Sequence, residues 1–261
     1  MEFGDVCDYQ NIKKQILDFK PDFIINLAAK TDLEWCELHK KETYKTNALG
    51  AENLGLISNL LDIPYIFISS AGIFDGKKEY YTEFDRPNPL NTYGLTKFYG
   101  EQYTLKTVKK HYVFRAGWMM GGGKKDKKFI SKIYKKILKG EKEIFIVDDK
   151  LGTPTYTNDF AFNIYKILDN SIPYGLYNMV CGGEASRYEV AKELIQLLDR
   201  NKIKINRVDS DYWKKEYFAI RPKSEKLKNL KLIARNSNYM RDWRICLKDY
   251  VNSDIFKEIK P

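Results

Sequence analysis

Short apolar runs alternate with longer amphipathic segments along the first 150 residues of the chain. The runs 21–29 and 65–69 are nearly continuous in apolar residues, which predicts strands buried on both faces. Two further runs, 112–116 and 143–147, also predict strands. Strands separated by helical segments of this length indicate βαβ units, a parallel sheet and right-handed crossovers. The intervening apolar residues recur at helical spacing, which predicts helices at 9–19, 40–61, 92–110 and 127–139.

The alternation becomes less regular after residue 150. Ser186 and Glu189 form a candidate capping box at the start of a helix. We therefore expect an α/β fold in which residues 1–150 form a parallel sheet flanked by helices. Residues 151–261 would form mainly a smaller lobe, with some segments returning to the main domain. The elements expected there are helices at 158–169, 187–199 and 240–251 and a strand at 203–208.

The chain is basic, with 45 lysines and arginines against 35 aspartates and glutamates and a formal net charge of +10. This balance permits anionic partners, from nucleotides to nucleic acid or an acidic membrane surface, without choosing among them. Segment 124–142 holds nine lysines against Asp126 and Glu141, and indicates either attraction of a substrate diphosphate or a solvated helix face. Its aromatic residues Phe129 and Tyr134 follow the apolar stripe of the predicted helix, so no exposed stacking row is available and nucleic-acid binding is not expected.

Several classes of protein are excluded by features that the sequence lacks. No run of 18 apolar residues is present, so we expect neither a transmembrane helix nor a membrane partner. The N-terminus has no basic region followed by an apolar stretch, as a secretory signal would have. The four cysteines include no CxxC pair, and the two histidines lie far apart, so neither a disulfide scaffold nor a metal site is expected. A reducing, cytoplasmic setting fits this pattern.

Ser70, Tyr93 and Lys97 form the candidate catalytic group. Tyr93 and Lys97 are four residues apart, so both side chains lie on one helix face. An ammonium beside a phenol favours the phenolate, which would lower the pKa of the tyrosine from its ordinary value of about 10. Such a tyrosine can give a proton to a carbonyl oxygen as hydride reaches the carbon. Ser70 follows the strand 65–69 at the carboxyl edge, where open α/β sheets bind ligands, and its hydroxyl can hold the same oxygen.

The Tyr-x-x-x-Lys spacing alone has a high chance rate, because similar pairs start at Tyr9 and Tyr188. An ordinary exposed pair on a helix is the alternative interpretation for Tyr93. Its context distinguishes it, since only this pair follows a buried strand that ends in Ser-Ser and a loop rich in glycine and proline.

The segments ISSAGIFDG (68–76) and NPLNTYGLTKFYGE (88–101) resemble the extended short-chain dehydrogenase/reductase family. The greatest similarity is to its dTDP-4-dehydrorhamnose reductase branch, which carries similar strings around a Ser/Thr-Tyr-Lys triad. The resemblance implies a Rossmann-like fold and the NADPH- or NADH-dependent reduction of a 4-keto nucleotide sugar in deoxysugar and polysaccharide biosynthesis. It continues in order along nearly the whole chain, through the segments 22–37, 114–121, 148–161 and 219–232.

The resemblance also implies a role for individual residues. Tyr93 would be the general acid and base, and Lys97 would tune it and bind the nicotinamide ribose. Ser70 would polarise the substrate carbonyl, with Ser69 as the alternative. The alternative interpretation of Trp118 is an aromatic residue of the core. The alternative interpretation of Arg221 is a surface salt bridge. The residues expected to line the cofactor are Asp5, Ala28, Ala29, Lys30, Asn47, Tyr93 and Lys97. Those expected to contact the sugar nucleotide are Ser69, Trp118, Thr153 and Arg221.

The family pattern breaks at the N-terminus. The family opens with a strand, a Gly-x-x-Gly-x-x-Gly turn and a helix, and these glycines let the backbone approach the cofactor pyrophosphate. This chain opens at Gly4-Asp5-Val6, which resembles the stretch after the family's third strand, so the dinucleotide-binding domain within 1–150 is expected to be truncated. The glycines at 121–123 do not replace the motif, because they lack its spacing.

Without the first strand, the strand at 21–29 should form an exposed apolar edge. Dinucleotide binding by the chain as written should be weak or absent. A misplaced start codon or truncated record, a missing part supplied by a second chain, or a remnant with another role would each explain the difference.

Two smaller departures leave the exact sugar open. Ala71 and Gly72 stand where the family often has an acidic residue and a tyrosine, and Lys30 stands where the branch often has histidine or tyrosine. A nucleotide-sugar epimerase or dehydratase is the enzymatic alternative, although a dehydratase usually adds acid–base residues next to the Ser/Thr, which Ala71 and Gly72 do not supply. A non-catalytic regulatory subunit is the other. A homodimer is compatible with the sequence, which does not fix the oligomeric state.

Overall fold

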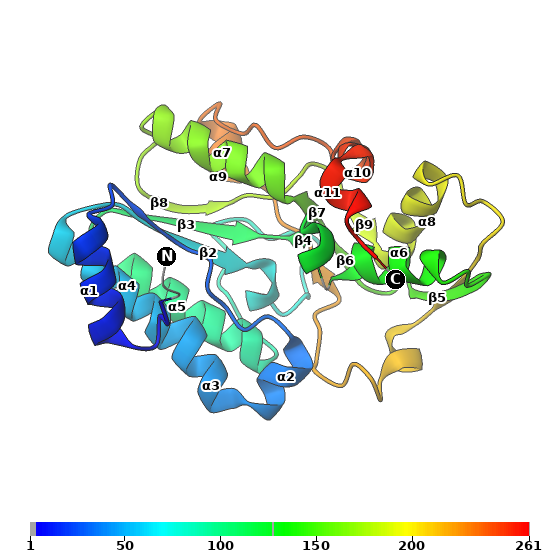
Figure 1. Cartoon of the computed structure of the whole chain (residues 1–261), viewed down its shortest axis with the longest axis horizontal. Helices are drawn as coiled ribbons and strands as arrows, with labels where there is room; N and C mark the ends of the chain where they lie inside the picture. The colour runs from blue at the N-terminus through cyan, green and yellow to red at the C-terminus, as the bar shows by residue number, and fades with distance from the viewer. Residues whose placement is uncertain (1–3, 127, 261) are drawn as a thin grey trace.

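The computed structural model describes residues 4–126 and 128–260. Its centre is a four-stranded parallel sheet with the strand order β1-β2-β3-β8 (Figure 1). The predicted parallel sheet flanked by helices is thus confirmed, and β8 is a further strand that the sequence pattern did not indicate. The four strands are β1 (Ile24–Asn26), β2 (Tyr65–Ser70), β3 (His111–Ala116) and β8 (Gly175–Asn178).

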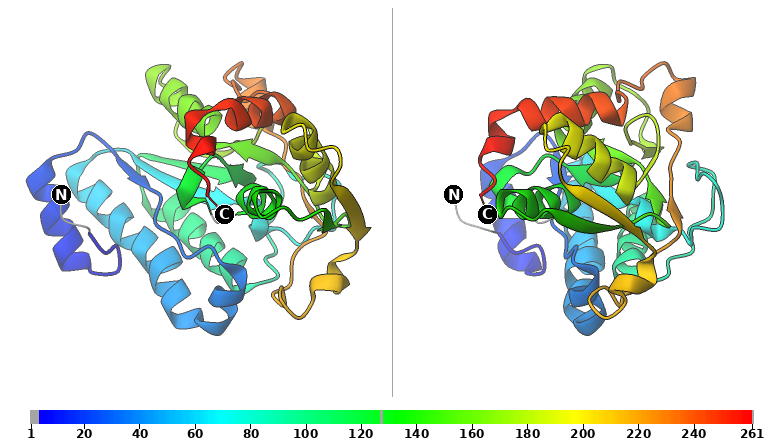
Figure 2. Two further views of the ribbon diagram at one scale, coloured as in Figure 1. Left: turned by 45° about the vertical axis from the view of Figure 1, so that its right-hand side comes forward. Right: turned by 90° about the vertical axis from the view of Figure 1, so that its right-hand side faces the viewer.

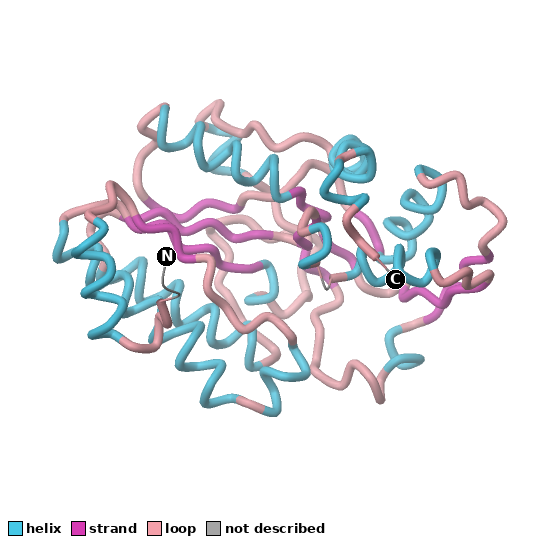
Figure 3. Tube along the Cα trace, in the orientation of Figure 1, coloured by secondary structure: helices cyan, strands magenta, loops and turns pink. Residues whose placement is uncertain are grey.

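Helices cover both faces of this sheet (Figure 1, Figure 3). One face is covered by α1 (Tyr9–Phe19), α4 (Gly50–Leu61) and α5 (Thr92–Thr107), and the other by α7 (Thr157–Asp169) and α9 (Leu230–Ala234). The single helix expected at 40–61 is instead interrupted. It is built from α3, a π-helical turn and α4, and is preceded by α2. The bounds of these new pieces are α2 (Leu33–Leu38), α3 (Lys40–Tyr44) and the turn Lys45–Leu49.

The strand β1 forms one edge of the sheet, because its pairing within the described residues is with β2 alone. Ile25 of this strand is 38% exposed, and the residues that flank the strand are also exposed, Phe23 by 43% and Leu27 by 75%. Burial on both faces was therefore a wrong prediction for this strand, whereas the expected exposed apolar edge is present. Only Ile24 and Asn26, which face α1 and α4, are buried.

The strands of the central sheet run toward a smaller lobe, as the two views in Figure 2 show. Three small sheets build it, with the pairs β4–β7 and β5–β10 and the order β11-β6-β9. The strand at 143–147 pairs in parallel with the strand at 204–208, so the division at residue 150 does not coincide with the strand pairing. The strands are β4 (Trp118–Met120), β5 (Glu143–Val147), β6 (Leu151–Gly152), β7 (Pro154–Tyr156), β9 (Ala185–Ser186), β10 (Lys204–Val208) and β11 (Ser224–Glu225).

The helices of the lobe pack on one extensive apolar core that continues from the α7 face of the central sheet. The capping box is present as predicted: Ser186 accepts from the backbone N–H of Glu189, whose carboxylate accepts from the backbone N–H of Ser186. Within the described ranges, the chain has no helix with the length and apolar character that crossing a bilayer requires. The remaining helices are α6 (Phe129–Leu138), α8 (Arg187–Leu197), α10 (Trp243–Asn252) and α11 (Asp254–Lys257), with short 3-10 turns at Ala71–Ile73, Gly123–Lys125 and Ser210–Trp213.

Candidate active site

The first turn of α5 lies against the carboxyl end of β2. The helix begins at Thr92 because the side chain of Asn91 caps it by accepting a hydrogen bond from the backbone N–H of Gly94 (2.8 Å). Only glycine fits at position 94, since a Cβ there would collide with the carbonyl oxygen of Gly72. This close approach places Tyr93 beside the residues that follow β2.

Ser70 and Tyr93 face the same space. A Cβ placed on Gly72 would lie 3.4 Å from Ser70 Oγ and 3.5 Å from Tyr93 Cε1. The Ser70 hydroxyl accepts from the backbone N–H of Gly72 (3.1 Å) and is near enough to the Tyr93 phenol to influence its pKa. Lys97 lies one turn farther along α5 and is 4% exposed, with its ammonium 4.2 Å from the centroid of the Phe67 ring. The structure therefore brings Ser70 and Tyr93 together and places Lys97 behind them.

Burial controls the pKa values of this group. It raises the pKa of Tyr93 to about 12, although the hydrogen bond from Ser70 opposes the change. Burial also lowers the pKa of Lys97 to about 7, with the negative charge of Glu101 acting in the opposite direction. The expected lowering of the tyrosine pKa by Lys97 is therefore wrong for this structure, because loss of hydration dominates at both residues. The phenol is neutral near pH 7 and carries a proton that it can donate.

A buried ion pair behind the site was missed by the sequence analysis. Glu101 is 0% exposed and Arg115 is 2% exposed. Arg115 donates to Glu101 through Nη2 (2.6 Å) and Nε (3.0 Å), and Ser69 Oγ donates to the same carboxylate (2.7 Å). Since neighbouring strand residues point to opposite faces, Ser69 faces α5 and the core, whereas Ser70 faces the shared space.

The residues predicted to line the cofactor surround the loop after β1. Asn47 holds this loop through both atoms of its amide, accepting from the backbone N–H of Lys30 (2.8 Å) and donating to its carbonyl oxygen (3.0 Å). The π-helical turn turns the Asn47 side chain inward, and π-bulges of this kind are frequent at functional sites. Ala28 donates its backbone N–H to Asn26 Oδ1 (3.0 Å), and Ala29, between these bonds, is half-buried.

Asp5 contributes to a separate N-terminal turn. It is exposed, and its carboxylate accepts from the backbone N–H of Cys7 (2.9 Å). Val6 in the same turn packs against Gly50 at the start of α4, immediately after the π-helical turn that carries Asn47. The turn therefore lies beside the segment that carries Asn47, and no hydrogen bond joins Asp5 to Asn47 among the described residues.

On the lobe side, Trp118 is held by two charged residues from other segments. Its indole Nε1 donates to Glu225 Oε2 (2.7 Å), and the guanidinium of Arg187 lies 3.5 Å from its ring centroid. Burial lowers the pKa of Arg187 to about 10. Gly152 also packs against the ring. Glu225 lies in the segment 219–232 and Arg187 lies in the capping box, but neither was singled out from the sequence, because no local pattern relates them to Trp118.

The other two residues predicted to contact the sugar nucleotide differ in their surroundings. Thr153 is 1% exposed, and its hydroxyl has no hydrogen-bond partner among the described residues, while its carbonyl accepts from the backbone N–H of Trp118 (2.9 Å). Arg221 forms a two-pronged ion pair with Glu34 of α2 (2.8 and 2.9 Å). This is the salt-bridge arrangement weighed as its alternative, and it joins the lobe to the main domain.

The lysine-rich segment contributes two contacts near this region. Lys128 donates to Thr31 Oγ1 (2.9 Å) in the loop after β1, and Lys132 donates to the hydroxyl of Tyr217 (3.2 Å). Phe129 and Tyr134 pack against the core, as the apolar stripe predicts. Lys127 of this segment lies outside the described residues.

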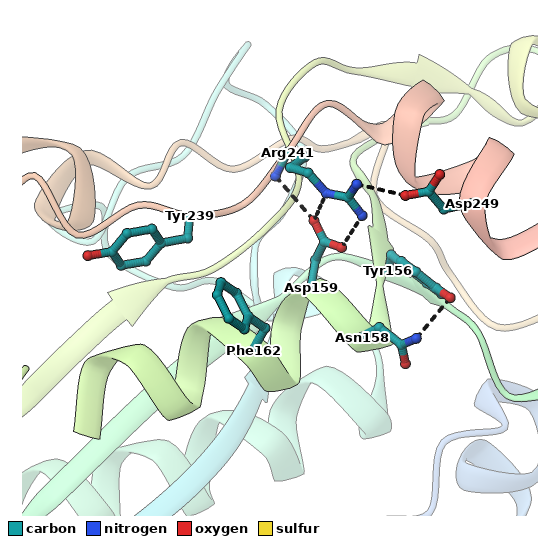
Figure 4. A pocket seen from close by; sticks show the side chains of 7 residues that line it. All are labelled: Tyr156, Asn158, Asp159, Phe162, Tyr239, Arg241 and Asp249. Atoms are coloured by element: carbon teal, nitrogen blue, oxygen red, sulfur yellow. Dashed lines mark hydrogen bonds and ion pairs between the residues drawn. The ribbon is translucent and has the colours of Figure 1, made fainter. Parts of the chain in front are cut away.

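A surface hollow of about 420 Å³ lies elsewhere, between α7 and α10 (Figure 4). Its charged side chains are already paired, because Arg241 donates to both oxygens of Asp159 (2.9 and 2.7 Å) and to Asp249 (2.7 Å). Behind it, Cys181 and Cys246 bring their sulfur atoms to 3.5 Å near Asp159, a group of potential metal ligands that the sequence spacing did not indicate. Arg241 is bonded to the carboxylate of Asp159, so these two side chains form a structural ion pair.

Comparisons with known proteins agree with this geometry. A family model described as the RmlD substrate binding domain matches residues 2–255. The spore coat polysaccharide biosynthesis protein SpsK of Bacillus subtilis is 30% identical over 193 residues, which are 74% of this chain and 66% of that protein. A solved dTDP-4-dehydrorhamnose reductase from Clostridium acetobutylicum has 31% identity and a TM-score of 0.88, covering 95% of this chain and 86% of that one. The reductase of the same name from Bacillus anthracis, solved with NADP, has 29% identity and a TM-score of 0.87 at the same coverage.

The family match extends over nearly the whole chain, and the solved relatives share its arrangement of sheet and lobe. The resemblance inferred from the sequence is thereby confirmed. This chain belongs to the family of the RmlD substrate binding domain, within the extended short-chain dehydrogenases/reductases.

Proposed function

We propose that this chain reduces a 4-keto nucleotide sugar with NADPH or NADH, as the dTDP-4-dehydrorhamnose reductases among its relatives are named for doing. One observation carries the proposal most directly. A serine hydroxyl and a neutral phenol, Ser70 and Tyr93, face one space at the carboxyl edge of a parallel sheet, with a buried lysine behind them. Two hydroxyl donors that converge on one point can hold and protonate a carbonyl oxygen.

The surroundings of Lys97 fit a nicotinamide cofactor. Its ammonium is buried against Phe67 and makes no hydrogen bond within the described residues, so its three donors are available to acceptor oxygens such as ribose hydroxyls. The other side of the nicotinamide ring would be lined by the loop residues that Asn47 holds in place, Ala28, Ala29 and Lys30. When bound, the reduced nicotinamide supplies the hydride that the protein itself lacks.

The protein residues would handle the proton. Ser70 donates its hydroxyl to the carbonyl oxygen and fixes its position. Tyr93, protonated because its pKa is about 12, transfers its phenolic proton to that oxygen as negative charge develops there. The phenolate left behind would be stabilised by the positive charge that Lys97 carries below its pKa of about 7.

The proposal also assigns each ligand to a part of the chain and includes the oligomeric state. The main sheet, largely within residues 1–150, would hold the cofactor, and the lobe would hold the sugar nucleotide through Trp118, Thr153 and Arg221. The second of these, Thr153, offers a buried hydroxyl that has no partner among the described residues. A homodimer stays a prediction, which light scattering on the purified chain would test.

The test follows the oxidation of NADPH in the presence of a dTDP-4-keto-6-deoxy sugar, first with the native chain and then with Tyr93→Phe. We expect the substitution to slow reduction by about 10²–10⁴-fold, because it removes the proton donor and leaves the ring in place. As a control, the two proteins should show the same thermal unfolding midpoint within a few degrees. Equal rates for the native chain and Tyr93→Phe would refute the assigned role. No turnover by the folded native chain, even at NADPH concentrations high enough to compensate for the weak binding expected from the sequence, would refute the proposed activity.

A further inference from the structure

The space in front of Ser70 and Tyr93 has a third wall from a remote part of the chain. A Cβ on Gly72 would lie 3.4 Å from Glu225 Oε1, at the same distance as from Ser70 Oγ. Gly72 has no side chain, so the carboxylate of Glu225 and the proposed catalytic pair border one small volume. The negative charge of Glu225 also contributes to the raised pKa of Tyr93, which places the two groups within electrostatic reach.

Glu225 is held in a fixed orientation. Its backbone lies in β11, paired in parallel register with Gly152 of β6. Its Oε2 accepts the indole N–H of Trp118 at 2.7 Å, and that ring is itself covered by the guanidinium of Arg187. No hydrogen bond to Oε1 is found among the described residues, and the side chain is only half-buried. One carboxylate oxygen is thus anchored, and the other faces the shared volume.

The chemistry of the three walls is complementary. Ser70 and Tyr93 are donors suited to a carbonyl oxygen, whereas an ionised carboxylate only accepts hydrogen bonds. A 4-keto-6-deoxy sugar whose carbonyl meets the two donors carries a hydroxyl group on one neighbouring carbon, C3. On the basis of the proposed function, we propose that Glu225 is a specificity-determining residue that accepts a hydrogen bond from a sugar hydroxyl on a carbon next to the carbonyl.

This role for Glu225 changes the conclusion, drawn from the sequence, that no acidic side chain lies next to Ser70. Ala71 and Gly72 leave the position after Ser70 without a polar side chain. The structure supplies a carboxylate to the same place from β11 instead, through space that glycine leaves empty. A site built to bind a hydroxyl discriminates against ligands that lack one, because an acceptor that the bound ligand shields from water is then left unpaired.

The test measures binding of two ligands by isothermal titration calorimetry, without any cofactor. The ligands are dTDP and dTDP-rhamnose, the alcohol that reduction of the corresponding 4-keto sugar yields. Glu225→Ala should weaken binding of dTDP-rhamnose by about tenfold or more, as for loss of a hydrogen bond to a charged group, and should change the affinity for dTDP less than twofold. Glu225→Gln, which keeps one acceptor oxygen, should fall between Glu225→Ala and the native chain.

A matched control variant separates this role from a general change of charge. Glu79→Gln alters an exposed glutamate whose carbonyl accepts from Ser224 beside Glu225, and it should match the native chain.

Three results would overturn the inference in distinguishable ways. Equal dTDP-rhamnose affinities for Glu225→Ala and the native chain would remove the role of Glu225 and leave the proposed function intact. Binding of neither ligand by the folded native chain would overturn the proposed function together with this inference. Uptake of deuterium from D₂O next to the carbonyl of the 4-keto sugar, if lost in Glu225→Ala, would replace hydroxyl binding by acid–base catalysis.

Discussion

Breaking the ion pair between Arg115 and Glu101 should destabilise the chain strongly. Both side chains lie in the interior, and two hydrogen bonds of 2.6 and 3.0 Å join them. Arg115→Met keeps an unbranched apolar side chain and removes the guanidinium, so the carboxylate of Glu101 would be left with the hydroxyl of Ser69 as its remaining side-chain partner. Such an uncompensated buried charge costs about 3–5 kcal/mol of unfolding free energy.

The same loss can be expressed as a melting temperature. An unfolding entropy of about 2.1 cal/mol/K per residue, applied to a chain of 261 residues, turns 3–5 kcal/mol into a fall of about 5–9 °C. The double variant Arg115→Met/Glu101→Gln removes both charges and keeps an amide oxygen for Ser69. It should recover more than half of the loss, because most of the penalty belongs to the unpaired charge rather than to the missing bond.

Urea unfolding followed by circular dichroism measures both effects, and the two single variants with the double variant complete a thermodynamic cycle. The reasoning would be refuted if Arg115→Met cost less than about 1 kcal/mol. It would also be refuted if the double variant were less stable than Arg115→Met, since the pair would then stabilise through its bonds alone.

Two further perturbations test the burial of Lys97 and the exposed edge of the sheet. Burial holds the pKa of Lys97 at about 7, below its ordinary value of 10.5. Between these two pH values the unfolded chain binds a proton at Lys97 that the folded chain lacks, so the free energy of unfolding rises with pH. Lys97→Met should therefore be more stable than the native chain at pH 6, with the difference narrowing toward pH 10; urea midpoints across this range measure it, and a constant difference would contradict the assignment. Ile25→Lys places a charge on the exposed face of the edge strand β1, so light scattering should show less self-association than for the native chain. The free energy of unfolding should change by less than about 1 kcal/mol. Unchanged self-association would show that the chains do not associate through this edge.

Local rules explain why the proposed catalytic group could be found from the sequence. Tyr93 and Lys97 are related by helix periodicity, and Ser70 is placed by the end of a strongly apolar strand. Glu101 could have been found by the same rule, because it lies four residues beyond Lys97 on the same helix face. Its partner, Arg115, belongs to a buried strand, where a charged residue itself signals a pairing.

Features that depend on long-range packing were not accessible in this way. The strand β8 (Gly175–Asn178) begins with glycine and ends with asparagine, so no apolar run marks it, and it is defined by its pairing with β3. The pairing of β5 with β10 joins segments that neither pattern nor spacing relates. The pKa of Tyr93 was predicted in the wrong direction, because the sequence shows a neighbouring charge but not the loss of hydration that outweighs it.

The two consecutive serines at the end of β2 belong to two groups of residues, one that stabilises the fold and one that borders the candidate active site. Ser69 points into the core, where Glu101 and Arg115 lock the strand to α5, while Ser70 points into the volume bordered by Tyr93 and Glu225. The first group is buried and its members are hydrogen-bonded to one another, so changes in it affect stability before anything else. The second group is completed by β11, a two-residue strand flanked by loops, and loops tolerate substitution far better than core strands do. The position of the reacting carbonyl would therefore be set by the rigid sheet and helix, and the choice of sugar by residues such as Glu225 that the lobe brings to the same volume.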